Sequence, residues 1–164
     1  MNPRLALVAV ISLVGLAAFV ATVSATPAKE FTAVQQWKGV FGDIDIKTNE
    51  FKPHKVKIDA KGVSDVYITR NSIGVGGSSG WHTHPGPSLI IVTAGEITAY
   101  RGDDPTCTPQ RYHAGEGFVD PGDGQVHILR NESDAAAETV AFQIIPKDAM
   151  RRIDTPAPDG TCPF

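Results

Sequence analysis

The stretch GWHTHPG at residues 80–86 places His82 and His84 two residues apart. In a β-strand, residues i and i+2 point to the same face, so both imidazoles can converge on one point. A third histidine, His127, lies in the apolar segment 126–129, just after a Pro-Gly-Asp-Gly turn. If the two segments pair, three imidazoles face one ion and leave its other positions open. We therefore predict a metal site on His82, His84 and His127.

The other two histidines offer no such pattern. His54 stands beside Lys52 and Lys55 and is expected on the surface, and His113 is not expected to be a ligand. An isolated histidine on a strand is usually structural or exposed, so the histidine pair alone leaves a non-binding role open. Trp81 alternates with His82 and is expected to pack on the opposite face of its strand.

Short apolar segments surround this stretch and alternate with clusters of Gly, Pro, Asn and Asp. Such segments, rich in β-branched and aromatic residues and divided by turn residues, are typical of β-strands. Only Lys29–Lys38 is expected to form a short turn of helix. We predict strands at 56–58, 66–69, 89–93, 97–101, 118–119, 126–129 and 139–145. The pattern predicts one all-β domain over residues 31–150, followed by a Pro-rich tail at 151–164.

The N-terminal segment has the features of a signal peptide. Arg4 precedes an apolar run, and Val23-Ser24-Ala25 supplies the small residues that signal peptidase recognises. Cleavage after residue 25 is predicted, with an uncleaved membrane anchor as the alternative, because about 19 apolar residues nearly span a bilayer. In either case the folded part is expected outside the cytoplasm.

Export affects how the two cysteines are interpreted. In an oxidising compartment an even number of cysteines favours a disulfide, here between Cys107 and Cys162, over two free thiols. This bridge would hold the tail against the loop near Pro105 and Pro109. The net charge of −3 and the lack of a basic cluster argue against nucleic acid as a partner.

Two spaced motifs resemble those of the cupin superfamily. The first is Gly76-(five residues)-His82-Thr83-His84-(three residues)-Ser88-(six residues)-Gly95, and the second is Gly115-(five residues)-Pro121, continued by Gly124-(two residues)-His127-(three residues)-Asn131. The resemblance implies a single-domain jelly-roll β-barrel with the metal in its interior, and cupins often form homodimers.

Two positions depart from the motifs. Ser88 stands where the first motif usually has a glutamate ligand, so the expected site has three histidines and no carboxylate. One extra residue between Pro121 and Gly124 leaves Asp123 in the turn. It either lengthens the turn or shifts the register of His127, and the preserved spacing to Asn131 favours the longer turn.

With the predicted signal peptide, the resemblance implies an exported metal-binding protein, with a non-haem dioxygenase acting on a small anionic or enolisable substrate as the leading hypothesis. The expected cofactor is one divalent ion, with Fe(II) favoured and Mn, Ni, Cu or Zn as alternatives, since imidazole accepts them all. A non-catalytic binding module and a metal-assisted isomerase or lyase are the alternatives. The expected partner is a small molecule, with no membrane contact after signal cleavage.

Overall fold

A computed structural model describes residues 24–48, 53–160, 162 and 164 of the chain. Of the predicted signal peptide, residues 1–23 lie outside the described part. Among the described residues, no helix is long and apolar enough to cross a membrane.

Twelve β-strands make up the regular structure of the described residues, which include no α-helix. In chain order they are β1 (Lys29–Phe41), β2 (Ile44–Thr48), β3 (Val56–Ala60), β4 (Ser64–Ser78), β5 (His82–Thr83), β6 (Ser88–Ala94), β7 (Glu96–Arg101), β8 (Gln110–His113), β9 (Gly117–Asp120), β10 (His127–Arg130), β11 (Ala137–Pro146) and β12 (Ile153–Asp154).

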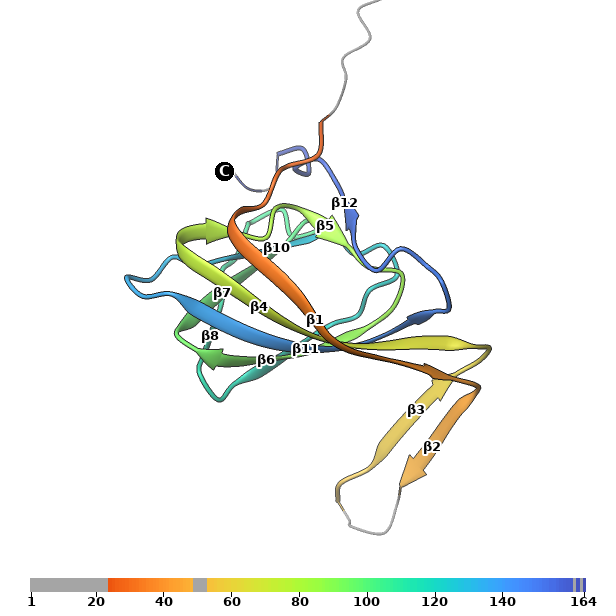
Figure 1. Cartoon of the computed structure of the whole chain (residues 1–164). Helices are drawn as coiled ribbons and strands as arrows, with labels where there is room; N and C mark the ends of the chain where they lie inside the picture. Colours follow the sequence, from red (N-terminus) through yellow and green to blue (C-terminus); the bar gives the residue numbers. More distant parts are fainter. Residues whose placement is uncertain (1–23, 49–52, 161, 163) are drawn as a thin grey trace, which may run out of the picture.

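Ten of these strands form one antiparallel sheet that curls into a barrel (Figure 1). Its main path runs β12-β5-β10-β4-β11-β6-β9, with β1 beside β4 and the pair β7–β8 beside β10. Strands far apart in sequence are therefore neighbours, as in a jelly roll. The prediction of an all-β jelly-roll barrel is confirmed. A separate hairpin, β2–β3, projects away from the barrel (Figure 1).

The predicted helical turn at Lys29–Lys38 is wrong, because these residues belong to strand β1. Strand β1 pairs with β4 along almost its whole length, from Lys29 opposite Ser78 to Phe41 opposite Ser64. Thr32, Val34 and Trp37 are residue types that favour strands. Pairing along β4 thus decides the conformation, and tertiary context overrides a weak helical pattern.

Buried apolar side chains of the described residues form two clusters. One comprises Ile73, Val92, Ile97, Leu129 and Ala137. The other comprises Trp81, Tyr100 and Ile128, and it packs against Cys107 and Cys162, which form the predicted disulfide. The bridge therefore attaches the tail to the barrel wall directly behind the strand that carries the first histidines.

The turn before His127 absorbs the extra residue without a shift in register. Gly122, Asp123 and Gly124 all adopt positive φ angles, of 69°, 52° and 81°. His127 nevertheless pairs with Arg101 on β7 and with His82 on β5. The longer turn, rather than a displaced strand, is therefore what the structure contains.

Candidate metal centre

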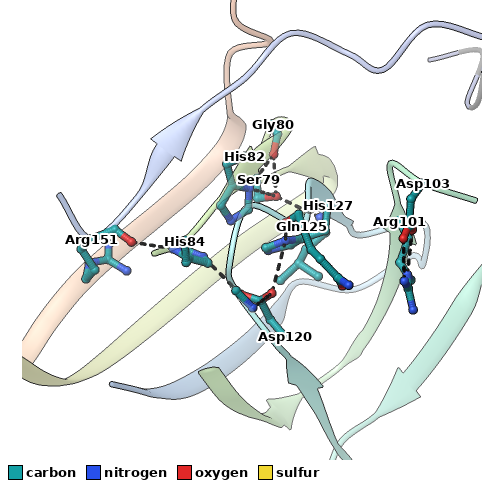
Figure 2. Close-up of polar contacts among 12 residues, drawn as sticks. Ser79, Gly80, His82, His84, Arg101, Asp103, Asp120, Gln125, His127 and Arg151 are labelled. Atoms are coloured by element: carbon teal, nitrogen blue, oxygen red, sulfur yellow. Dashed lines mark hydrogen bonds and ion pairs between the residues drawn. The ribbon is translucent and has the colours of Figure 1, made fainter. Parts of the chain in front are cut away.

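Strands β5 and β10 bring the three histidines together at one end of the barrel interior. His127 lies directly opposite His82 in this antiparallel pair, and His84 follows two residues after His82. One nitrogen from each ring lies within 4.8 Å of one from each of the other two. Figure 2 shows the three rings converging, so the structure brings together the three residues that the sequence analysis predicted as metal ligands.

Each ring is oriented by a backbone carbonyl that faces its Nδ1 atom. The acceptors are the carbonyls of Gly80 for His82 at 2.9 Å, Arg151 for His84 at 2.6 Å and Gln125 for His127 at 3.2 Å. A carbonyl only accepts, so each Nδ1 must carry the proton and each Nε2 keeps a free lone pair. This is the tautomer that a metal ligand needs, and such outer contacts are typical of metal-binding histidines.

Burial keeps the three imidazoles neutral. It is the largest cause that lowers the pKa of His82 well below its usual value, with the neighbouring His127 and Arg152 charges adding to it. Burial likewise lowers the pKa of His84 to about 4 and also lowers the pKa of His127. At neutral pH each ring therefore lacks the second proton, on Nε2, that would compete with a cation.

A carboxylate that the sequence analysis did not find lies beside the cluster. Asp120 ends strand β9, is only 6% exposed, and lies directly opposite Ser88 on β6. Its Oδ2 atom is 3.8 Å from Nε2 of His84, and its Oδ1 atom is 3.7 Å from Nδ1 of His127 (Figure 2). The backbone N–H of Gly122 donates to Oδ1 at 2.9 Å. The buried Oδ2 atom has no hydrogen-bond partner among the described residues.

Asp120 supplies the charge that Ser88 lacks. Directly opposed residues on antiparallel strands point to the same face, with Cβ atoms about 5 Å apart. Both side chains line the cavity that also contains the three histidines. A carboxylate thus lies on the neighbouring strand, opposite the position where the first motif usually has a glutamate. In the sequence, the two-residue spacing from Phe118 indicates only that Asp120 shares a strand face with it. The pairing of β6 with β9 is what shows that Asp120 lies opposite Ser88.

The cavity in front of the histidines is small. Its free volume is about 40 Å³, and its wall includes the apolar residues Phe31, Ile90 and Phe118. A buried water needs about 10–15 Å³, so there is room for roughly three waters or a ligand of similar size. Gln143 also lines the cavity, and its buried Oε1 atom has no partner among the described residues.

Other aromatic and histidine residues lie away from the cavity. Trp81 is fully buried in the cluster behind it, as expected, and the hydroxyl of Tyr100 donates to Glu132 at 2.9 Å. His113 is exposed and faces Glu96 on the outer wall, and His54 is exposed beside the projecting hairpin.

The tail after β11 contributes two arginines that the sequence analysis did not assign to the site. Strand β12 pairs with β5, which brings Arg151 and Arg152 to the cavity. Arg152 is held in place: its Nη2 atom donates to the carbonyl of Ser79 at 2.5 Å and its Nε atom to Asp154 at 2.6 Å. Arg151 contributes its backbone carbonyl, which accepts a hydrogen bond from Nδ1 of His84.

The fold is a single β-barrel whose interior holds three convergent histidines that are positioned to bind a metal ion. The family model for the cupin domain matches residues 71–142, which contain all three histidines and Asp120. Over this segment the chain is therefore similar to the cupin domain.

Solved structures with a similar fold include an oxalate oxidase, with 24% identity over 50% of this chain and 46% of that chain, at a TM-score of 0.43. An uncharacterised conserved protein with a double-stranded β-helix domain from Klebsiella pneumoniae subsp. pneumoniae shares 19% identity over 70% of this chain and 84% of its own, at a TM-score of 0.44. A cupin superfamily protein from Desulfitobacterium hafniense shares 12% over 65% and 78%, at a TM-score of 0.42. This chain thus spans less than half of the oxalate oxidase chain. No curated protein matches the chain.

Proposed function

We propose that the protein binds one divalent metal ion through His82, His84, His127 and Asp120, and acts as a dioxygenase-like enzyme on a small anionic or enolisable substrate. One observation carries the proposal: three buried, neutral imidazoles turn their unprotonated nitrogens toward one point, each fixed by a backbone carbonyl. Burying three polar rings that share no hydrogen bond with each other costs free energy, which a bound cation offsets.

The residues present fit such an ion. The unpaired Oδ2 atom of Asp120 lies on the Nε2 side of His84 and gives the site an anionic donor. Three imidazoles with one carboxylate and open positions suit Fe(II) and related first-row metals. Fe(II) is therefore the favoured ion, with Mn, Ni, Cu and Zn as the alternatives.

A bound Fe(II) ion would supply Lewis acidity and one-electron chemistry, while the chain's own residues bind and orient the substrate. The cavity walls formed by Phe31, Ile90 and Phe118 exclude bulk water from the ligand nitrogens. Gln143 presents an amide to the same space and can accept a hydrogen bond from a substrate.

The location and assembly of the protein are part of the proposal. The disulfide between Cys107 and Cys162 supports an oxidising compartment outside the cytoplasm. The outer face of the barrel exposes Leu89, Ile91 and Val119, whose side chains are 52%, 53% and 61% exposed. An apolar area of this kind supports association into a homodimer.

Metal analysis of the purified protein tests the proposal, with the variants His127→Ala and His113→Ala side by side. We expect about one ion per chain in the wild type and in His113→Ala, which loses only a surface imidazole, and little in His127→Ala. A wild type that takes up none of Fe(II), Mn(II), Ni(II), Cu(II) or Zn(II) contradicts the metal site.

Turnover separates the reaction classes once the ion is present. Oxygen consumption with a panel of small acids supports the dioxygenase reading. Anaerobic conversion of a substrate supports an isomerase or lyase instead, and tight metal binding without any turnover supports a binding module.

A further inference from the structure

Among the three histidines of the candidate metal centre, His84 differs in the origin of the carbonyl that orients it. The carbonyls that face the other two rings lie two residues before them, in the same segment of chain. The carbonyl that faces Nδ1 of His84 belongs to Arg151, 67 residues away in the C-terminal tail. The orientation of His84 therefore depends on the docking of the tail, whereas the other two rings keep their acceptors without it.

The tail is docked on the barrel with little apolar burial. Within the described segment 150–160, no residue is buried. Strand β12 pairs with β5 over two residues, and next to this pair the N–H of Thr155 donates to the carbonyl of Trp81 at 3.0 Å. Arg152 adds its hydrogen bond to the carbonyl of Ser79. A segment held by a few polar contacts and little apolar area opens at a low cost in free energy.

The disulfide holds the far end of this segment. It joins Cys162 in the tail to Cys107, 55 residues earlier in the sequence. With the bridge closed, the segment is attached at both ends and stays at a high effective concentration beside β5. With the bridge open, its end is free, so undocking gains chain entropy. Both cysteines are only half-buried, which leaves the bridge within reach of a small thiol.

We propose that this disulfide is a redox switch for the metal site: its reduction releases the tail, removes the acceptor from Nδ1 of His84 and weakens metal binding, and its reoxidation restores both. The inference rests on the proposed metal site. The reductant is a dithiol. One of its thiolates attacks a sulfur of the bridge, the S–S bond breaks and a mixed disulfide forms, and its second thiol then displaces the other cysteine. Cys107 and Cys162 thereby gain two electrons and two protons, and the dithiol is oxidised to its own disulfide.

The first measurement is the Co(II) affinity, from competition with a chelator followed by the visible spectrum of the ion. It compares oxidised wild type, wild type reduced with a dithiol that is then removed, and the double variant Cys107→Ser with Cys162→Ser. The double variant needs no reductant and has no thiol that could itself bind the ion. We expect an affinity about tenfold to a hundredfold lower in both disulfide-free proteins, with recovery when the wild type is reoxidised.

Val92→Ala is the control for a general loss of stability. Val92 lies in the apolar cluster that does not contact the cysteines, so this variant weakens the core while the bridge and the tail are intact. Its Co(II) affinity should equal that of the wild type. An equal loss of affinity in Val92→Ala and in the double variant overturns the switch, because lowered stability alone then explains the effect.

Hydrogen exchange of the ring N–H groups, measured by NMR on the metal-free protein, shows which imidazole responds. Without the disulfide, the Nδ1–H of His84 should exchange at least about tenfold faster, while the rings of His82 and His127 change little. Equal acceleration in all three rings overturns the role of the tail.

The remaining outcomes separate the switch from the metal site. Equal Co(II) affinity with and without the bridge, in a wild type that binds the ion, overturns the switch and leaves the metal site standing. If the wild type takes up no metal, the metal site fails, and the exchange rates of the metal-free protein then decide whether the bridge controls His84. A disulfide-free protein that does not stay folded also overturns the switch, because the bridge is then a requirement for folding.

Discussion

Acidification should destabilise the metal-free protein through its buried histidines. In the unfolded chain a histidine has a pKa near 6.5, whereas burial lowers the pKa of folded His84 to about 4. The unfolded state therefore binds a proton first as the pH falls, and stability decreases from about pH 6.5 downward. Above pH 6.5 both states are neutral and this effect is absent.

The size of the effect follows from the two pKa values. For His84 alone, linkage gives a loss of about 2 kcal/mol at pH 5 and about 3 kcal/mol once the folded state is also protonated. The pKa values of His82 and His127 are lowered by burial as well, so they act in the same direction. The loss for the whole cluster at pH 5 should thus be at least about 2 kcal/mol.

Urea unfolding of chelator-treated protein at pH 7.5 and pH 5, with the disulfide intact, measures this loss. The variant His84→Gln has no imidazole to titrate, so its difference between the two pH values should be smaller by about 2 kcal/mol. Comparing pH differences rather than absolute stabilities removes the cost of the substitution itself. Equal unfolding free energies at both pH values in the wild type would refute the conclusion that the three rings are buried and neutral.

Three further predictions follow from contacts at and near the site. Asp120→Asn should weaken divalent-ion affinity at least about tenfold in chelator competition, while Ser88→Ala, across the same strand pair, should change it little. Gly122→Ala should lower the melting temperature more than Gly124→Ala: both have positive φ, but an added Cβ at Gly122 meets a backbone oxygen at 2.2 Å, whereas Gly124 faces open space. Reducing the disulfide should lower the unfolding free energy by about 2–4 kcal/mol in urea titrations with and without reductant.

Much of the fold was accessible from the sequence because its signals are local. The period-two spacing of His82 and His84, the apolar segments and the turn residues each depend on a few neighbouring positions. The motif spacing then indicated the barrel, and the pairing of His127 with His82 agreed with it. Strand β1 was missed because its conformation depends on pairing with β4, about 35 residues away, and not on its own composition.

The missing parts of the site are those that depend on long-range register. Asp120 reaches the cavity because β9 pairs with β6, and Arg151 reaches it because β12 pairs with β5. Nothing within a few residues of either position indicates these pairings. A Pro-rich tail held by a disulfide has the composition of a loose appendage, yet its backbone orients a histidine of the cluster.

Ser88 at the usual glutamate position implies a site without a negative charge, but the carboxylate of Asp120 lies opposite Ser88 on the neighbouring strand. Opposed residues on antiparallel strands share a face and stand about 5 Å apart, so a carboxyl group can move from one strand to the other while the backbone stays unchanged. An aspartate at 120 is shorter than a glutamate at 88, but it starts from the strand that leads directly into the turn before His127. Its Oδ1 atom accepts the N–H of Gly122 in that turn, which fixes the carboxylate with Oδ2 toward His84. Under the proposed metal site, the anionic donor that Ser88 does not provide is therefore offered by Asp120 on the neighbouring strand.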